Sequence, residues 1–418
     1  MTLTPPPLRN DCFSLPAGVD WTPVDEALAL LRDRLQRVVS SEELPLTTAA
    51  GRILAADVIA NRSNPALPNT AVDGYGFAGP IAEGTHVLPL MRGRAAAGLA
   101  YEGTVPAGQA IRILTGAALP DGVDTVILEE DVTLGTAEIA FHGPLKRGAN
   151  TRNAGEDVTS GAVILPAGRV LTPADLALTA AAGVAKVEVY KPLRVGVLST
   201  GDELCEVGEA AAAGQIYDAN RPMLLALLRQ MGFVPVDLGR VVDDRDALRA
   251  RLDTAAAQVD VILTSGGASA GDEDHVSALL RQSGALQEWR IALKPGRPLA
   301  LAMWQGVPIF GLPGNPVAAL VCTLIFARPA MGQMAGAKWH QPQGFDLPAA
   351  FAKHKKPGRR EYLRARVRQG QVEVFKSEGS GRISGLSWAE GLVELADGGA
   401  QIQPGDLVRY IPYSAFNL

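Results

Sequence analysis

Glycine turns, carboxylates and cations alternate along residues 260–319 of this 418-residue chain. An apolar run, Val261–Leu263, leads into the turn Ser265-Gly266-Gly267, and the acidic trio Asp272-Glu273-Asp274 follows it. A glycine turn after a strand lets backbone N–H groups approach an anion, whereas acidic oxygens suit a hard divalent cation. The spacing therefore predicts a site at which a metal ion and a phosphate group meet.

A cationic loop, Lys294-Pro295-Gly296-Arg297-Pro298, comes next in the chain. Its prolines restrict the backbone, so the two cations stay close together. Arginine supplies a planar fork and lysine a point charge, and this pair suits an oxyanion that carries two charges. The alternative interpretation is a surface turn before the strand expected at 299–304.

A second glycine turn, Leu312-Pro313-Gly314-Asn315-Pro316, ends the following expected strand. Asn315 is a suitable N-cap, and Pro316 a suitable first residue, for the helix that the apolar spacing of 317–325 predicts. The cap needs only these two residues. The preceding Pro313-Gly314 therefore indicates that the turn also forms the wall of a pocket.

Two further polar turns lie earlier in the chain, each after an apolar run and before a helix start. Their sequences are Thr200-Gly201-Asp202-Glu203 and Tyr217-Asp218-Ala219-Asn220. The helix dipole alone stabilises a carboxylate at such a position by about 0.3–1 kcal/mol. Helix capping is thus the alternative to a ligand-binding role for these acids.

Carboxylates that gather at one sheet edge need a compensating charge. Two of them about 4 Å apart repel by roughly 4 kcal/mol at an effective dielectric of about 20. We therefore expect Glu203, Asp243 or Asp244, and Asp274 to share a magnesium-type ion, which binds a few carboxylates together with ligand phosphates. For Asp243 and Asp244, which precede a helix, separate exposure to solvent is the alternative.

The composition is that of a globular protein, with 47% hydrophobic and 20% charged residues. A net charge of −5 gives no general affinity for nucleic acids. The basic segment 354–366 is either a local patch for such a partner or, in the interpretation we prefer, the solvated face of a small β-domain. Three cysteines without a Cys-x-x-Cys motif indicate a reducing compartment. With no evident signal peptide and no long uncharged apolar run, we expect a soluble, cytoplasmic protein without membrane partners.

The expected elements predict an α/β plus β multidomain fold. From Lys191, strands alternate with helices, which predicts a doubly wound parallel sheet whose ligand site lies at the carboxyl ends of its strands. The short strands expected at 87–91, 110–114, 125–129 and 137–141 predict a β-rich insertion, and those after 338 a barrel-like domain. The parts are a flexible tail (1–18), an elongated helical linker and dimerisation domain (19–60 with 151–190), the inserted β-rich domain (61–150), the α/β domain (191–337) and the C-terminal β-domain (338–418).

The motif Thr-Pro-x-Asp occurs at 22–25 and again at 172–175, each time before a run with helical spacing. Threonine as N-cap with proline at the next position is a helix-start signal. The shared motif suggests that the two helices that follow it belong to one structural unit.

Taken together, five motifs resemble those of the molybdopterin molybdenumtransferases of molybdenum cofactor synthesis, a family that includes MoeA and the E-domain of gephyrin. They read TGDEL, IYDANRPML, TSGGASAGDED, LKPGRP and GLPGNPVAA. The segments DGYGFA, TGAALPDGVDTVI and RNAGEDV extend the resemblance over residues 20–415. It implies a four-part protomer and a homodimer whose clefts each use both chains. It also implies a reaction in which adenylylated molybdopterin, molybdate and a divalent cation, usually Mg²⁺, give the molybdenum cofactor and AMP.

From the residues and the resemblance together, we expect the following site. Its catalytic residues are Glu203, Asp274, Asp73, Asp157 and Thr115, and the resemblance implies that the last three face the partner protomer's cleft. Its metal ligands are Glu203, Asp243 and Asp274. Its pterin- and nucleotide-binding residues are Thr200, Gly201, Asp202, Asp218, Asn220, Ser265, Gly266, Gly267, Pro313, Gly314, Asn315 and Pro316. Its molybdate-binding residues are Arg290, Lys294, Arg297, Pro298, Arg364 and Ser384.

Some positions depart from the commonest pattern of the family. Arg290 and Arg297 stand where lysine is frequent, which keeps the charge but changes the geometry. Ala268 and Ala270 replace common valines and should alter packing only. We hypothesise that metal ions bridge the adenylate phosphates at Glu203 and Asp274 while Lys294 and Arg297 hold molybdate.

Two other functions fit parts of this pattern. A molybdopterin adenylyltransferase, a protein that we also expect as a transient partner, shares the α/β domain, but the additional β-domains argue against this function. A non-enzymatic scaffold, as gephyrin is at synapses, is the other alternative. ATP consumption would mark the first, and a peptide-binding groove without molybdate binding would mark the second.

Overall fold

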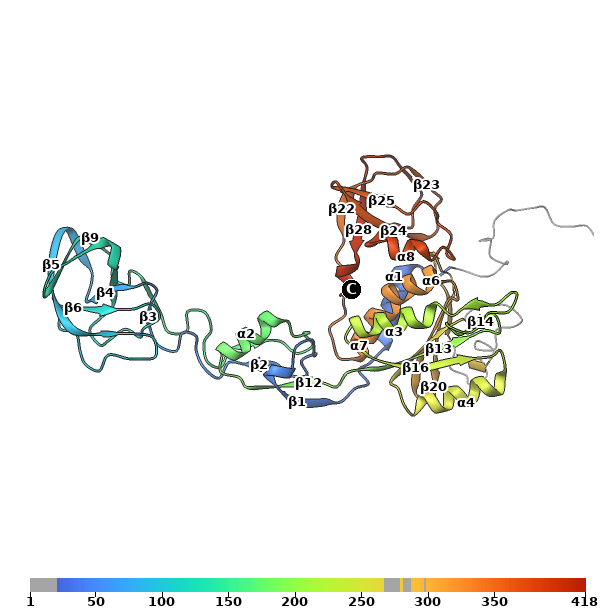
Figure 1. Ribbon diagram of the computed structural model, residues 1–418, viewed down its shortest axis with the longest axis horizontal. Coiled ribbons are helices and arrows are strands. Elements are labelled where there is room, and N and C mark those ends of the chain that lie inside the picture. Colours follow the sequence, from blue (N-terminus) through green and yellow to red (C-terminus); the bar gives the residue numbers. More distant parts are fainter. Residues whose placement is uncertain (1–20, 267–278, 281–286, 297) are drawn as a thin grey trace, which may run out of the picture. The chain divides into compact units, whose positions relative to one another are not determined.

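The computed structural model describes residues 21–266, 279–280, 287–296 and 298–418, without the side chains of 287–290 and 298. The chain forms two compact units (Figure 1). The main unit combines the residues up to Ser41 with Tyr190–Leu418, and the inserted unit is Glu42–Val189. The main unit is therefore interrupted in sequence by the whole inserted unit.

A six-stranded sheet forms the α/β domain of the main unit. Its strands, in spatial order, are β16 (Val234–Val241), β13 (Arg194–Thr200), β17 (Val261–Ser265), β21 (Val307–Leu312), β20 (Pro298–Trp304) and β18 (Gln287–Arg290). The first four are mutually parallel. β17 is buried along its whole length, as the continuous apolar run of a central parallel strand requires.

Strand β20 runs antiparallel to both of its neighbours, so the prediction of a wholly parallel sheet is wrong. The cause is the short connection between β20 and β21. Trp304 pairs with Val307 across two turn residues, Gln305 with φ +49° and Gly306 with φ +84°. Two successive positive φ values are typical of the type I′ turn that joins antiparallel strands, whereas parallel neighbours need a crossover of a dozen or more residues.

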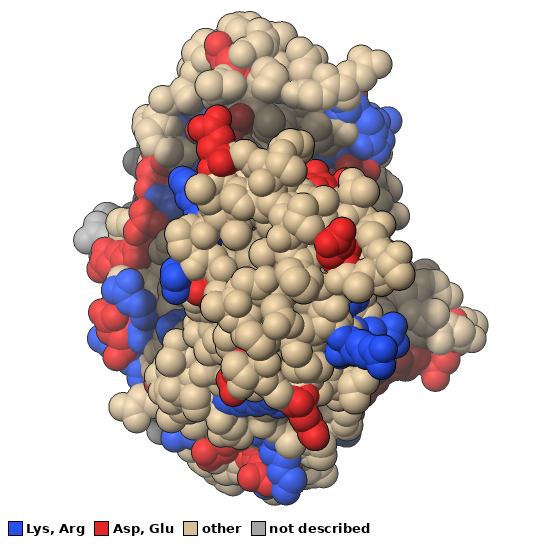
Figure 2. Space-filling model, turned by 90° about the vertical axis from the view of Figure 1, so that its left-hand side faces the viewer, with Lys and Arg blue, Asp and Glu red and all other residues tan. Residues whose placement is uncertain are grey.

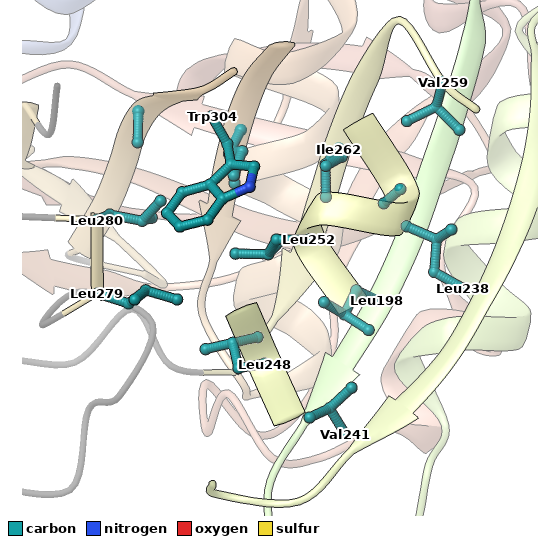
Figure 3. Close-up of a cluster of buried hydrophobic side chains, with 13 residues drawn as sticks. Leu198, Leu238, Val241, Leu248, Leu252, Val259, Ile262, Leu279, Leu280 and Trp304 are labelled. Atoms are coloured by element: carbon teal, nitrogen blue, oxygen red, sulfur yellow. The ribbon is translucent and has the colours of Figure 1, made fainter. Parts of the chain in front are cut away.

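Helices α3 (Asn220–Gln230) and α4 (Arg245–Ala256) lie on opposite faces of this sheet (Figure 1). Leu248 and Leu252 of α4 pack with Leu198 and Ile262 of the sheet and with Trp304 of β20 (Figure 3). Each fully buried leucine contributes roughly 1.5–3 kcal/mol. This core fixes the strands whose carboxyl ends carry the predicted site.

The helix predicted to start at Asn315-Pro316 is confirmed, although the Asn315 side chain forms no capping hydrogen bond. It runs through α6 (Pro316–Cys322), a π-helical segment (Thr323–Ala327) and α7 (Arg328–Met334). These 19 residues are long and apolar enough to cross a membrane, but 89% of the 18-residue window that passes this test lies buried inside the protein. A helix that is apolar on all sides and so enclosed is a core helix.

The C-terminal part of the main unit is a second sheet, built around β24. Its order is β19 (Leu293–Lys294), β24 (Arg360–Arg368), β26 (Gly391–Leu395), β28 (Leu407–Pro412) and β22 (Phe345–Pro348), with β25 (Gln371–Val374) also on β24. The strands β23 (Lys353–Lys355) and β27 (Ala400–Ile402) form a separate pair, and α8 is Ser384–Trp388. Because β19 pairs with β24, the predicted oxyanion loop is joined directly to this domain.

The basic segment 354–366 is not simply a solvated face, so our preferred interpretation is wrong for two of its cations. Lys355 is 1% exposed and Arg364 is 4% exposed. The Lys355 ammonium group donates to the carbonyl of Gly398 at 2.7 Å and to that of Lys356 at 3.1 Å. Backbone carbonyls thus replace the water that these cations lose on burial.

Helix α1 (Val24–Arg34) belongs to the main unit, whereas α2 (Pro173–Ala181) belongs to the inserted unit, so their predicted pairing is wrong. Gln333 of α7 donates to the carbonyls of Arg32 and Leu35. The predicted cap at Thr22 is also wrong. The N-cap position is Pro23, and Thr22 instead forms a β-bridge with Ile291.

The inserted unit contains the β-rich domain that the sequence predicts. Its main sheet has the order β7 (Thr125–Leu128), β4 (Gly74–Phe77), β6 (Ala110–Ile113), β5 (Ile81–Ala95), β9 (Glu138–Leu145) and β8 (Val132–Leu134). All four strands predicted by residue range occur here, at β5, β6, β7 and β9. Three short pairs complete the unit: β1 (Ser41–Pro45) with β12 (Lys186–Tyr190), β2 (Val58–Ile59) with β11 (Val163–Leu165), and β3 (Asn69–Thr70) with β10 (Thr151–Arg152).

The end of the inserted unit that carries β5 and β9 faces the viewer in Figure 2. Most of the surface drawn there is uncharged, and the basic side chains that gather toward its left edge are interspersed with acidic ones. Nucleic-acid affinity depends mainly on clustered Lys and Arg contacts to phosphates. On this face of the described chain, the surface lacks such a cluster.

Candidate functional site

Three parallel strands end level with one another at the carboxyl edge of the α/β sheet. Ser199 of β13 pairs with Ser265 of β17, and Ser265 pairs with Leu312 of β21. The turns that follow at Thr200, Gly266 and Pro313 therefore begin side by side. Ligands of α/β sheets bind at this edge. The structure thus brings together three of the four polar turns that the sequence singles out.

Asn220, the first residue of α3, ties two of these turns together. Its Nδ2 donates to Ser265 Oγ at 2.8 Å and to the Gly314 carbonyl at 2.7 Å. Asn220 is 7% exposed. The side chain therefore holds the β17 and β21 loops at a fixed separation around a buried polar point.

The glycines of these turns allow close backbone approach. Gly266 has φ +93°, and a Cβ atom on it would lie 2.6 Å from the Thr200 carbonyl oxygen. A Cβ atom on Gly201, with φ +141°, would lie 2.3 Å from a carboxylate oxygen of Glu203. Glycine alone among the residue types tolerates both the backbone conformation and the missing space.

Several buried oxygens at this edge have no hydrogen-bond partner within the described part of the chain. They include Thr200 Oγ1 and Asn220 Oδ1. Buried polar atoms in native proteins nearly always have a partner, which can be water or a ligand. The edge is therefore suited to a polar ligand that supplies the missing donors or acceptors.

The acids that follow β13 and β16 also meet at this edge. The Asp243 N–H donates to Asp202 Oδ1 at 3.0 Å, and the Asp202 N–H donates to Asp243 Oδ2 at 3.3 Å. Glu203 is exposed beside them. Carboxylate oxygens are the ligands that a hard divalent cation prefers. Asp274, the third expected ligand, lies outside the described residues, and those that are described include no cluster of three His, Cys, Asp or Glu residues able to hold a metal.

Asp218, predicted to bind substrate, is buried and hydrogen-bonded to Arg221. It is 3% exposed and accepts hydrogen bonds from both the backbone and the side chain of Arg221 at 3.1 Å. Arg221 also bonds Asp237 at 2.9 Å and contacts Glu206. Burial works to lower the pKa of Arg221, but its bonds to Asp237 and Asp218 raise it above the ordinary value. Asp218 thus fixes the entry to α3.

The predicted oxyanion residue Lys294 lies in a compact group of charges that we call the lysine–glutamate cluster: Lys294, Lys353, Glu361 and Glu378. Lys294 Nζ is 2.6 Å from Glu378 Oε2 and 3.5 Å from Glu361 Oε2. Lys353 Nζ is 3.1 Å from Glu361 Oε2 and also contacts Glu378 Oε1. A cavity of about 190 Å³ adjoins the cluster, lined among others by Pro295, Arg364 and Ser377.

The protonation states of the cluster follow from its geometry. Burial works to raise the pKa of Glu378, but hydrogen bonds from Lys294 and Lys353 outweigh it and leave this pKa below the ordinary value. Burial likewise works to lower the pKa of Lys353, and its bonds to Glu378 and Glu361 raise it instead. At neutral pH, Glu378 is therefore a carboxylate and Lys353 an ammonium group.

Arg364 lines the same cavity, but its donors are engaged elsewhere. Its guanidinium group donates to the carbonyls of Arg382, Ser377 and Gly379. Burial lowers its pKa. Arg364 thus holds the loop between β25 and α8 in place, and the sequence gives no signal for this role. Ser384 is exposed at the first position of α8.

Asp73 and Thr115 lie together in the inserted unit, although 42 residues separate them. Asp73 Oδ1 accepts hydrogen bonds from both the backbone N–H and the hydroxyl of Thr115, each at 2.6 Å. These bonds hold the pKa of Asp73 below its ordinary value. Asp157 is also exposed and accepts a bond from Asn64 Nδ2 at 3.1 Å. The pair forms an exposed, ionised carboxylate of fixed orientation.

Some of the remaining predicted site residues lie in the described part of the chain and others lie outside it. Pro313 is buried, Gly314 and Asn315 are exposed, and Pro316 opens α6. Gly267, Asp274 and Arg297 lie outside the described residues, as do the side chains of Arg290 and Pro298. The structure gives no site geometry for these five residues, and the roles assigned to the other predicted site residues stay predictions as well.

Sequence reasoning missed three members of the lysine–glutamate cluster: Lys353, Glu361 and Glu378. Glu361 directly faces Lys294 in the register of β19 and β24. Only a prediction of that strand pairing could have found it, because the two residues are far apart in the chain. Glu378 lies in a loop without periodicity, and no feature of the sequence marks it.

Family models cover most of the chain in three consecutive segments. They match as the MoeA N-terminal region (domain I and II) at residues 22–183, a probable molybdopterin binding domain at 196–333, and the MoeA C-terminal region (domain IV) at 346–413. The fold and the site edge thus define a multidomain protein with mixed sheets, built around a molybdopterin-binding-type α/β domain.

Full-length relatives agree with this class. A molybdopterin molybdenumtransferase of Haemophilus influenzae is 36% identical, covering 94% of this chain and 98% of the relative. Molybdopterin molybdenumtransferase 2 of Mycobacterium tuberculosis is 34% identical, covering 87% and 94%. The crystal structure of the molybdopterin biosynthesis MoeA protein from Pyrococcus horikoshii OT3 is 28% identical, covers 94% of this chain and all of that one, and superposes with a TM-score of 0.82. The chain belongs to the MoeA family of molybdopterin molybdenumtransferases.

Proposed function

We propose that this protein transfers molybdenum from molybdate to adenylylated molybdopterin and releases AMP, giving the molybdenum cofactor. The observation that carries the proposal is the convergence of the β13, β17 and β21 turns, with their glycines and unpartnered buried oxygens. The names of the full-length relatives support the same reaction. The lysine–glutamate cluster supplies cations for the second, anionic substrate in the same unit.

The adenylate and pterin would bind along the carboxyl edge of the sheet. The glycine turns would let phosphate oxygens approach the backbone closely, and Thr200 and Asn220, whose buried oxygens have no partner in the described chain, would supply the side-chain contacts. A divalent cation such as Mg²⁺, held by Glu203 and Asp243 together with Asp274, would neutralise phosphate charge as AMP leaves. The protein needs no covalent nucleophile for this chemistry, because positioning and charge neutralisation suffice.

The exposed Asp73–Thr115 pair and Asp157 would complete the cleft of a partner protomer in a homodimer. The support for this is chemical. A carboxylate held ionised and oriented at an exposed position has the properties expected of a group that acts on a ligand outside its own unit. We also propose a four-part division of the protomer, in which α1 belongs to the main unit and not to the linker domain.

The metal-handling role of Glu203 is testable by comparing Glu203→Gln with Glu209→Gln. Both glutamates are exposed, and both lie in the segment that follows β13. We expect Glu203→Gln to release AMP roughly 100-fold more slowly, because the cation loses a charged ligand next to the phosphates. Glu209→Gln should match the unaltered protein. The measurement is AMP release from adenylylated molybdopterin with molybdate and Mg²⁺, together with reconstitution of a molybdenum enzyme.

The results of this assay distinguish the proposed transferase from an adenylyltransferase. Normal AMP release by Glu203→Gln would contradict its proposed role. Consumption of ATP in place of AMP release would identify an adenylyltransferase instead.

A further inference from the structure

The Glu378 carboxylate bridges two ammonium groups in the way that a bound oxyanion would. Its Oε2 contacts Lys294 and its Oε1 contacts Lys353. Two separate cations that bind the two oxygens of one planar anion could equally bind two oxygens of a tetrahedral anion. The position between the two ammonium groups is therefore an oxyanion seat that the chain itself fills.

The two acids of the cluster differ in how easily they could leave. Glu361 lies on β24 in register with Lys294, and 5% of it is exposed. Glu378 lies in the loop between β25 and α8, and 45% of its side chain is exposed. Arg364 holds the backbone of that loop at Ser377 and Gly379. Glu378 can thus turn into solvent by side-chain rotation while its loop stays in place.

The charges of the cluster explain why this displacement would matter. Two ammonium groups and two carboxylates sum to zero, which offers little attraction to a dianion. With Glu378 turned away, the seat carries one net positive charge beside a cavity of about 190 Å³. Only the molecules in which Glu378 is turned away can then bind the dianion. The apparent affinity for the dianion is reduced by the fraction of molecules in this state.

We propose that Glu378 is an internal counterion that a tetrahedral oxyanion must displace, and that Lys353 is a second oxyanion-binding cation beside Lys294. The inference rests on the proposed function, which makes molybdate a substrate. It assigns a binding role to Lys353 and a displaceable counterion role to Glu378 within the lysine–glutamate cluster.

Calorimetric titration of the full-length protein with molybdate tests the proposal without any catalytic turnover. We expect Glu378→Gln, which keeps the shape and removes the charge, to bind molybdate with a Kd about tenfold lower than that of the unaltered protein. We expect Lys353→Gln to raise the Kd about tenfold, because the seat then loses one of its two cations.

Matched controls separate the seat from general charge effects. Glu373→Gln removes a carboxylate of the same domain that pairs with Arg366, and Lys356→Gln removes an exposed cation near Lys353. Neither should change the Kd. Melting temperatures of all variants check that each is folded.

An unchanged Kd in both Glu378→Gln and Lys353→Gln would overturn the inference and leave the proposed function standing, because the unaltered protein would still bind molybdate. A Kd that rises in Glu378→Gln would show a structural ion pair and would also overturn it. Absence of molybdate binding in the unaltered protein and in Glu378→Gln alike would overturn the proposed molybdate site together with the inference.

Discussion

Gly266 shows how a single residue can define the geometry of the ligand edge. The turn at Gly314 lies close to Gly266, because a Cβ atom on Gly314 would be 3.8 Å from Gly266 Cα. The Gly266 N–H donates to the Leu312 carbonyl at 3.3 Å. Three loops therefore approach one another closely at Gly266, which a residue with a side chain would not allow.

We expect Gly266→Ala to lower the free energy of unfolding by about 2–4 kcal/mol, since a positive φ and a backbone clash both oppose the methyl group. Gly232→Ala is the matched control. Gly232 has φ +84° but no atom within 4 Å of the added Cβ, so it should lose only about 1 kcal/mol. Urea unfolding followed by fluorescence measures both values. Equal losses would show that the close approach at Gly266 carries no energetic weight.

At the scale of elements, the same start signal has two different outcomes. Thr172 forms a full capping box with Asp175 at the start of α2, whereas Thr22 is drawn into a β-bridge and leaves α1 uncapped by any side chain. Local sequence could not decide between them, because the competing partner, Ile291, is far away in the chain. Long-range strand pairing overrides a local preference in this case.

The capping box gives a prediction about pH. Asp175 is 4% exposed and its pKa is lowered, mainly by the bond from Arg169 and against the effect of burial. Its contribution should be complete above its ordinary pKa of about 3.9 and should be lost as the pH falls through the lowered value in the folded protein. We expect Asp175→Asn to destabilise the inserted unit by about 1–2 kcal/mol at pH 7 and equally at pH 5. The difference should shrink only below about pH 4.

Hydrogen exchange of the α2 amides as a function of pH measures this effect locally. Glu43→Gln is the control, because Glu43 pairs with Lys186 at a surface where 63% and 61% of the two side chains are exposed. Screened surface pairs contribute little, so its exchange should match that of the unaltered protein. A deficit in Asp175→Asn that grows as the pH falls from 7 to 4 would contradict the assignment.

Several elements and part of the site could be predicted from the sequence. The apolar runs of β13, β17 and β21 and the glycine turns after them specify the ligand edge locally. The antiparallel β20 could also have been predicted, because only Gln305-Gly306 separates it from β21. By contrast, the pairing of Lys294 with Glu361 depends on the register of β19 with β24, and such non-local pairing leaves no local signature.

At the scale of the whole molecule, the site that we propose uses residues of both units. Glu203 and Lys294 belong to the main unit, whereas Asp73, Thr115 and Asp157 belong to the inserted unit. A homodimer in which each protomer lends its inserted unit to the other would satisfy this requirement with the closed twofold symmetry that is commonest among oligomers.

Mixed dimers test this arrangement. We expect Asp73→Asn and Glu203→Gln each to be nearly inactive alone. Denatured together and refolded as an equal mixture, half of the dimers contain one of each chain, and each of these has one intact cleft. The mixture should therefore regain about a quarter of the unaltered activity in the AMP-release assay. Activity that stays at the level of the single variants would show that each cleft uses one chain only.

The order in which the chain is synthesised adds a consequence of the interrupted main unit. Val24, Ala27 and Leu31 of α1 are fully buried, yet α1 receives hydrogen bonds from Gln333, which follows Arg32 by 301 positions. At roughly 5–20 residues per second, a ribosome needs about 15–60 s to add that stretch. The inserted unit leaves the ribosome complete within this interval, while the apolar stripe of α1 still awaits its cover. The first helix of the described residues is thus among the last to find its final place, and chaperones that shield nascent apolar surface have much to protect at α1.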